Sequence, residues 1–200
     1  MRSDVMQRRA KILPAILAAV LLLPASANAQ KFWGLTGGAT LSDLSDTYGA
    51  YSSDSRWGGT AGIVFGVRTY RSTTISLEPA WWSRGGGDLN ASYVNVPLIF
   101  GAAVRSNNGA MRYGFYSGIA AAFKLSCSDE GIVENPCDHI DGTDWTIPLG
   151  FRLLKALGKP GTFFGVDVNY SIPLDRSFDN LDVGQRTWTF RLMYVKGIVP

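Results

Sequence analysis

The chain has 200 residues and a formal net charge of +3, with 46% hydrophobic residues and 23 glycines. Its positive excess lies in the first 29 residues: without them, the 19 basic and 16 acidic residues fall to 15 of each, so charge gives no argument for a nucleic-acid partner. No later segment has roughly 18 or more consecutive apolar residues, which excludes a membrane-spanning helix there.

Residues 1–29 have the pattern of a cleaved secretory signal. Arg8, Arg9 and Lys11 provide a positive start, residues 12–23 an apolar stretch, and residues 27–29 an A-x-A cleavage site. The apolar stretch is shorter than the roughly 20 residues that a helical anchor needs. We therefore expect a signal peptide at 1–29, export across the inner membrane, and one domain at 30–200.

The rest of the chain shows the period-two alternation of β-strands, separated by turn residues. Apolar residues alternate with glycine, threonine, serine and other polar residues in every segment. In chain order the segments are 32–41, 58–69, 74–84, 92–104, 111–125, 145–154, 162–174 and 186–196. The third segment is unusual because Glu78 and Pro79 lie in the middle of it; a proline there suggests a bulge or a missing ladder bond.

These segments predict an all-β fold, a single up-and-down antiparallel transmembrane β-barrel of about eight strands. Connections near Tyr70, Asn107 and Gly158 are short. The connections at the opposite end are mostly longer and comprise 42–56, 85–91, 126–144 and 175–185. Outer-membrane barrels have tight periplasmic turns and long external loops, so we expect both termini on the periplasmic side.

The two faces of the predicted strands decide between a membrane barrel and a soluble one. The polar face consists mostly of small residues with few charges, which would make a poor water-exposed surface. The apolar face is continuous and carries aromatic residues near the strand ends, as in the interfacial girdles of outer-membrane barrels. The predicted girdle comprises Trp33, Trp81, Tyr113, Trp145, Tyr170, Trp188 and Tyr194.

The alternation also predicts a charge network inside the barrel, because a charge facing lipid near the midplane would cost about 2–4 kcal/mol. The predicted lumen residues are Arg68, Glu78, Arg84, Lys124, Arg152, Asp167 and Arg191. Antiparallel pairing across 175–185 brings Asp167 level with Arg191, and Glu78 is expected to meet Arg68 or Arg152. We interpret the network as filling the lumen, with conduction or proton relay as the less favoured interpretation.

The remaining acidic residues gather in the predicted external segments. They include Asp43, Asp46, Asp54, Asp88, Glu130, Glu134, Asp138, Asp141, Asp175 and Asp182. The opposite end carries Lys31, Arg71, Arg105, Lys155, Lys159 and Lys196. An acidic rim beside lipopolysaccharide would attract divalent cations or basic partners, although ordinary solvated loops explain the same pattern.

Cys127 and Cys137 share the longest predicted loop, and in an oxidising compartment they predict a disulfide. A zinc site would add His139 but lacks a fourth ligand, so no metal site and no cofactor are expected. His139 with Ser126 or Ser128 suggests a lipid-modifying enzyme, yet no spacing holds a nucleophile against the imidazole and no G-x-S-x-G turn is present. The sequence therefore predicts a protein that is not an enzyme.

Four stretches are similar to the PorT-like outer-membrane β-barrel family. They are GLTGGATLSDL (34–44), SLEPAWWSRGG (76–86), YVNVPLIFG (93–101) and GVDVNYSIPL (165–174). The proline-containing strands resemble the family's L-Q-P-E-L-L-Y-S-x-x-G and Y-L-E-I-P-L motifs, with Glu78, Ala80 and Asn95 as departures. The resemblance implies an outer-membrane barrel of a diderm bacterium, and it implies no common activity.

The expected function is structural or recognition-based and is carried by the acidic loops of a barrel with a side-chain-filled lumen. Expected partners are outer-membrane lipid and lipopolysaccharide, with an unidentified protein partner at either face, no nucleic acid, and a monomeric barrel. Three further hypotheses stay open: a soluble lipocalin-like binder of an apolar ligand, a lipid-modifying outer-membrane enzyme, and a narrow solute channel.

Overall fold

A computed structural model describes residues 30–46, 55–69, 72–86, 89–107, 109–129, 137, 142–158, 160–174 and 183–198. The predicted signal segment 1–29 and most of the predicted external loops lie outside these residues. The described part contains no helix with the length and apolar character that a membrane crossing requires.

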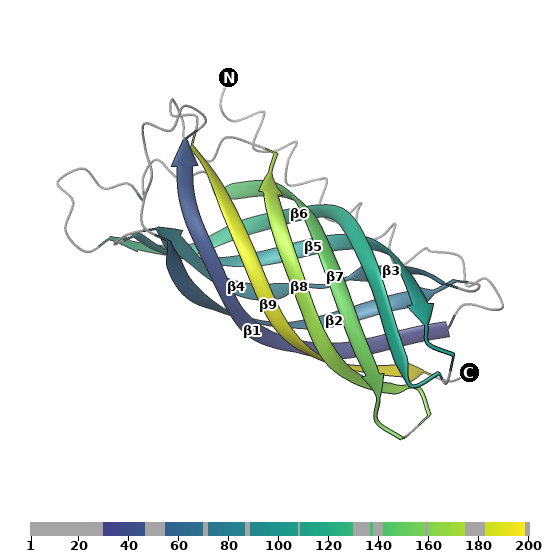
Figure 1. Ribbon diagram of the computed structural model, residues 1–200. Coiled ribbons are helices and arrows are strands. Elements are labelled where there is room, and N and C mark those ends of the chain that lie inside the picture. The colour runs from purple at the N-terminus through teal and green to yellow at the C-terminus, as the bar shows by residue number, and fades with distance from the viewer. Residues whose placement is uncertain are drawn as a thin grey trace.

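Within these described ranges, nine antiparallel strands form a single closed sheet (Figure 1). They are β1 (Gln30–Asp46), β2 (Arg56–Arg68), β3 (Thr73–Leu77), β4 (Ala80–Gly86), β5 (Leu89–Arg105), β6 (Met111–Asp129), β7 (Thr143–Ala156), β8 (Thr162–Pro173) and β9 (Val183–Ile198). Closure is made by β1, which pairs with β2 on one side and with β9 on the other. The predicted fold class, an all-β up-and-down antiparallel barrel, is confirmed.

The ring has eight wall positions because β3 and β4 follow each other in one of them. Both pair with β2 and with β5. The register is unchanged across the gap, since Leu77 pairs with Leu98 before it and Ala80 pairs with Asn95 after it. The predicted segment 74–84 is therefore one wall strand with an interruption at Glu78 and Pro79.

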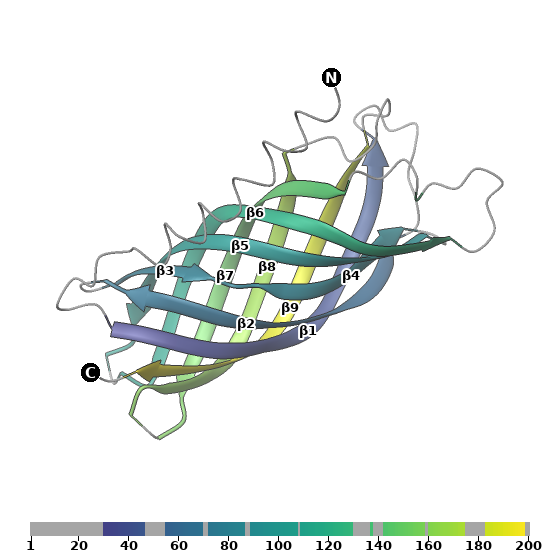
Figure 2. The same ribbon diagram turned by 180° about the vertical axis from the view of Figure 1, so that it is seen from behind.

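Two prolines explain the interruption. Glu78 donates its N–H to the carbonyl of Pro97 at 3.1 Å, and Ile63 donates to the carbonyl of Pro79 at 3.0 Å. Neither proline has an N–H to return, so each of these pairs makes one ladder bond in place of two. The break is thus a pair of missing bonds with no bulge. Figure 2 shows β3 and β4 in line on one wall.

The first residues of β1 and the last residues of β9 pair at the same end of the barrel. Figure 1 shows the start of β1 and the end of β9 side by side there. The turns at this end, 69–72, 106–110 and 157–161, are short, as expected. One predicted loop is wrong: 85–91 is mostly strand, because β4 runs to Gly86 and β5 begins at Leu89. The Gly85-Gly86 pair that looks like a turn continues the ladder instead.

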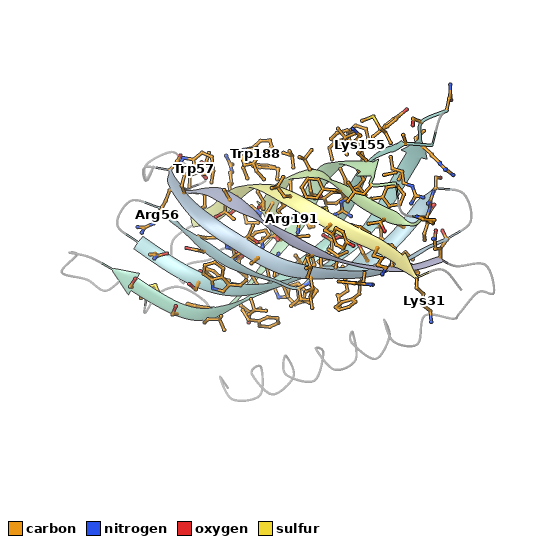
Figure 3. The ribbon with its side chains drawn as sticks, turned by 90° about the horizontal axis from the view of Figure 1, so that it is seen from below. Lys31, Arg56, Trp57, Lys155, Trp188 and Arg191 are labelled. Carbon is orange, nitrogen blue, oxygen red and sulfur yellow. A yellow bond between two sulfur atoms is a disulfide. The ribbon has the colours of Figure 1, made fainter. Side chains whose placement is uncertain are left out.

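The barrel is apolar outside, and its interior combines polar and charged side chains with a smaller apolar cluster that includes Val64, Met193 and Val195. Phe115, Leu192 and Phe100 point outward with 74%, 55% and 51% of their surface exposed. Thr189 and Asp167 point inward and are fully buried. Figure 3 shows Trp57 and Trp188 on the outer surface and Arg191 inside. This polarity is the reverse of a water-soluble barrel, where large apolar side chains pack inward.

Inward glycines make space for the few large side chains of the lumen. At Gly150 of β7, an added Cβ would collide with the ring of Tyr116, which belongs to the neighbouring strand β6. Gly150 is therefore needed because of this close approach.

We expect Gly150→Ala to destabilise the barrel by about 1–3 kcal/mol, because Tyr116 would have to leave its place. The measurement is the urea unfolding midpoint of the protein refolded in lipid vesicles. Gly37→Ala is the matched control, since its Cβ would meet nothing closer than the Thr60 carbonyl at 3.8 Å. Equal stability of the two variants would contradict this account of Gly150.

Candidate functional site in the barrel lumen

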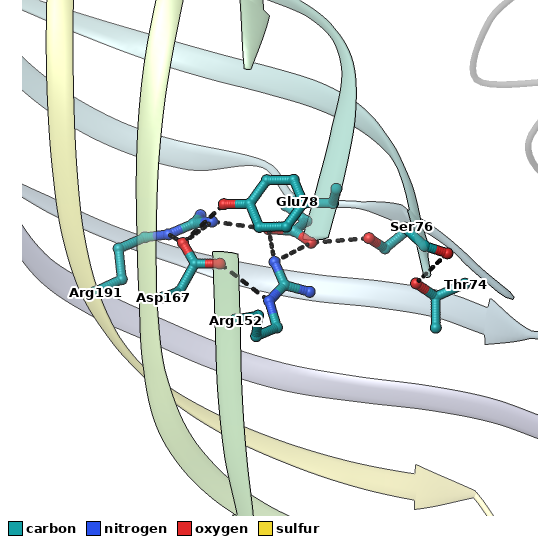
Figure 4. Close-up of polar contacts among 8 residues, drawn as sticks. Thr74, Ser76, Glu78, Arg152, Asp167 and Arg191 are labelled. Carbon is teal, nitrogen blue, oxygen red and sulfur yellow. Dashed lines mark hydrogen bonds and ion pairs between the residues drawn. The ribbon is translucent and has the colours of Figure 1, made fainter. Parts of the chain in front are cut away.

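Four charged side chains form a network across the middle of the lumen (Figure 4). They are Glu78 in the gap between β3 and β4, Arg152 of β7, Asp167 of β8 and Arg191 of β9. The contacts are Arg152 Nη2 to Glu78 Oε1 at 2.9 Å, Arg152 Nε to Asp167 Oδ2 at 3.0 Å, Arg191 Nη2 to Glu78 Oε2 at 3.1 Å and Arg191 Nη2 to Asp167 Oδ1 at 2.7 Å. Each guanidinium contacts both carboxylates.

Strand register brings three of these residues together. Asp167 pairs with Arg152 of β7 on one side and with Arg191 of β9 on the other. Inward alternation then puts the three side chains at one level. Glu78 reaches them from the facing wall, so the network joins two opposite sides of the ring.

Two neutral groups complete the network. Tyr116 donates its hydroxyl hydrogen to Asp167 Oδ1 at 3.0 Å, and Ser76 donates to Glu78 Oε1 at 2.8 Å. The Arg152 guanidinium also lies 4.8 Å from the centre of the Tyr116 ring. Sequence reasoning missed Tyr116 and Ser76; their inward parity in segments 111–125 and 74–84 was the available signal.

The network is neutral overall and closely packed. Its two carboxylates and two guanidinium groups balance, and Glu78, Asp167 and Arg191 have 5% or less of their surface exposed. Buried charges persist at this depth only when they are paired and hydrogen-bonded. The arrangement holds opposite walls together and leaves no unpaired charge among these four residues.

A second ion pair lies nearer the end that carries the long loops. Arg84 of β4 is 1% exposed and its Nη1 lies 3.4 Å from Asp144 Oδ2 of β7. Its guanidinium lies 4.3 Å from the ring centre of Tyr93 and 5.3 Å from that of Trp82. Aromatic faces attract a desolvated cation, so the two rings share the stabilisation of Arg84 with Asp144.

The predicted lumen residues therefore do not form one network but lie in separate groups along the barrel. Glu78 contacts Arg152, one of its two expected partners, and also Arg191, but not Arg68. Arg68 lies at the end of the barrel that carries the termini, and Lys124 donates to the Cys137 carbonyl at 3.0 Å near the other end. The prediction of only two inward acids is wrong, because β7 begins at Thr143 and turns Asp144 inward.

The disulfide lies toward the loop end of the barrel. Cys127 of β6 is bonded to Cys137 at 2.03 Å. His139 and the acidic residues Glu130, Glu134, Asp138 and Asp141 of the predicted loop 126–144 lie outside the described residues. No group of three or more metal-ligating side chains occurs within the residues that the structure describes.

The predicted girdle residues divide between the two ends of the wall. Trp33 and Tyr194 pack edge to face near the termini, with their ring centres 6.4 Å apart. The ring centres of Tyr170 and Trp188 lie 4.7 Å apart, toward the loop end. Trp81 and Tyr113 are exposed, and Trp145 is half-buried. Trp57, which the prediction omitted, is 63% exposed and contacts Phe190. It was missed because the predicted strand began at residue 58, whereas β2 begins at Arg56.

Comparison with solved structures agrees with the observed architecture. Neisserial surface protein A has a TM-score of 0.55 at 11% identity, covering 82% of this chain and 96% of that one. The outer-membrane protein OprG of Pseudomonas aeruginosa has a TM-score of 0.54 at 10% identity, covering 86% and 97%. No family model and no curated protein matches the chain, so the PorT-like resemblance stays a prediction. At these identities the likeness shows a shared fold, the antiparallel barrel of outer-membrane proteins.

We expect Glu78→Gln to lower the free energy of unfolding by about 3–5 kcal/mol, because Asp167 would be the one acid left for two buried guanidinium groups. The measurement is urea unfolding in lipid vesicles. The double variant Glu78→Gln/Arg191→Gln restores the charge balance, so its loss should be smaller than the sum of the two single losses. Additive losses, or a Glu78→Gln loss under about 1 kcal/mol, would show that the contacts carry little energy.

Proposed function

We propose that the protein is an integral β-barrel of a bacterial outer membrane, exported by a signal at 1–29. The observation that carries this proposal is the apolar outer wall, on which Phe115, Leu192 and Phe100 are more than half exposed. In water so continuous an apolar surface would aggregate, whereas lipid acyl chains suit it. Aromatic side chains near both ends of the wall fit the two membrane interfaces.

We propose further that the lumen is sealed and that recognition takes place at the loop end. The central network and the buried Arg84–Asp144 pair occupy the axis at two levels. A narrow solute channel would need an unobstructed path past both. The acidic residues at the loop end would face lipopolysaccharide and its divalent cations, which we propose as partners alongside lipid.

The same polarity bears on the soluble-binder and enzyme hypotheses. A lipocalin-like binder would have a mainly apolar interior, whereas here most large apolar side chains point outward and the interior also holds the central charge network. An enzyme built on His139 has no support among the described residues, and we propose no catalysis and no cofactor. A monomer fits a ring that closes on itself, because every wall strand has a partner on each side.

The membrane assignment is tested by Leu192→Arg. Leu192 pairs with Val166 and follows Arg191 of the central network, so it lies outward at mid-height. In lipid vesicles we expect a loss of about 2–4 kcal/mol of unfolding free energy, because the charge would face the bilayer midplane. Folding is followed by heat-dependent gel migration and by tryptophan fluorescence.

Lys155→Arg serves as the matched control, since Lys155 is also outward and exposed but already charged. It should leave stability within about 0.5 kcal/mol of the unsubstituted protein. A Leu192→Arg protein that folds in buffer without detergent, as stably as the original, would overturn the membrane assignment.

The sealed lumen is tested separately by planar-bilayer recording. The reconstituted protein should give no discrete conductance steps, because two layers of charged side chains block the axis. An open porin reconstituted in the same way confirms that insertion is detectable. Reproducible unitary steps from the unsubstituted protein would refute the sealed lumen and favour the channel.

A further inference from the structure

The lumen contains a cavity of about 80 Å³ at the end of the barrel that carries the termini. Its walls include Phe32, Leu154, Phe163 and Val195, which are apolar. Tyr116 and Arg152 also line it, so the central network closes it on the inner side. The cavity is therefore a pocket with one open end.

Two further arginines line this pocket, Arg68 of β2 and Arg112 of β6. Among the described residues that line it there is no aspartate or glutamate. Neither arginine takes part in any ion pair found within the described ranges. This differs from the centre of the lumen, where two guanidinium groups meet two carboxylates.

Arg112 packs against an aromatic ring, but one of its N–H groups has no hydrogen-bond acceptor. Its guanidinium carbon lies 4.0 Å from the ring centre of Phe163, a favourable cation–π contact. Its Nε is buried and has no hydrogen-bond partner. A buried donor without an acceptor costs about 1–3 kcal/mol, and in native proteins such a group calls for an explanation.

Like charges surround Arg112. Arg105 lies directly opposite it in the β5–β6 register, and Arg68 is close enough to act on its charge. Like charges at such positions repel each other, and the apolar wall weakens screening by water. An anion bound between them would relieve the repulsion and supply the missing acceptor.

We propose that this pocket binds a small organic carboxylate. A planar carboxylate matches the fork of a guanidinium, and a short aliphatic body suits the apolar walls. The volume is about half that of an engineered cavity that takes up benzene, so a few methylene groups fit. A strongly hydrated phosphate would have to lose its water against the same walls. Placement of the open end in the periplasm rests on the proposed function; the binding itself does not.

The test uses the chain in neutral maltoside micelles, with arginine labelled for NMR of the side-chain Nε–H groups. Butanoate is the probe, 1-butanol its neutral match and inorganic phosphate an anion without an apolar body. Butanoate should give saturable shifts of the Arg68 and Arg112 signals while the Arg191 signal stays in place. Butanol and phosphate should give no saturable shift at equal concentration.

Variants then assign the site. Arg112→Gln should weaken butanoate binding about tenfold or more, because a charge-assisted hydrogen bond is lost. Arg68→Gln should weaken it in the same direction, so the conclusion does not depend on one variant folding. Lys155→Gln removes a charge at the same end, one residue beyond the lining residue Leu154 but outside the pocket, and should leave binding unchanged.

Four outcomes would overturn the proposal: no saturable shift with butanoate, equal shifts with butanol, tighter binding of phosphate, or equal weakening by Lys155→Gln. Binding is read in micelles, so it is separable from the membrane assignment. A protein that binds butanoate but tolerates Leu192→Arg in buffer would keep the pocket and lose the proposed location.

Discussion

The structure depends on the narrowness of a closed ring with eight wall positions. Once the sheet closes, every inward side chain enters a lumen just wide enough for side chains. A charge there has little water and few neighbours, so it must meet an opposite charge from another strand. The four-residue network of Glu78, Arg152, Asp167 and Arg191 satisfies this constraint at mid-height, with each arginine joined to both acids.

Away from the centre, the same constraint is met in less complete ways. Arg84 has a carboxylate at 3.4 Å and two aromatic faces, so its charge is balanced while its nitrogens lack hydrogen bonds. Arg112 contacts the face of the Phe163 ring, and it forms no ion pair with a carboxylate among the described residues. Pairing is thus most complete in the middle and declines toward both ends, and the terminal end is where we propose that an external anion binds.

Much of this fold could be predicted from alternation. A period of two assigns each residue to a face, and the scarcity of charges on the small-residue face indicates which side is inside. Local register could be predicted as well, because the Asp167–Arg191 level follows from pairing adjacent strands. Contacts across the lumen could be predicted only in part. Glu78 contacts Arg152, one of its two expected partners, but its contact with Arg191 depends on the stagger of strands far apart in the ring.

Strand ends are the other source of error. The polar segment before Trp145 predicts a loop that includes Asp144, yet the ladder with β6 extends to Thr143. Polar and glycine-rich sequence is a poor guide to where a barrel strand stops, because the lumen itself requires small and polar residues.

The interruption at Glu78 and Pro79 has a mechanical consequence. The wall there lacks one backbone hydrogen bond on each flank, so backbone pairing resists deformation less along this gap than in an uninterrupted part of the ladder. Glu78 lies in the gap and is held by two guanidinium groups from the far side. Ion pairs therefore connect this wall to the far side of the barrel at the height where the two ladder bonds are missing, so side-chain charges stabilise a part of the sheet that the backbone stabilises less.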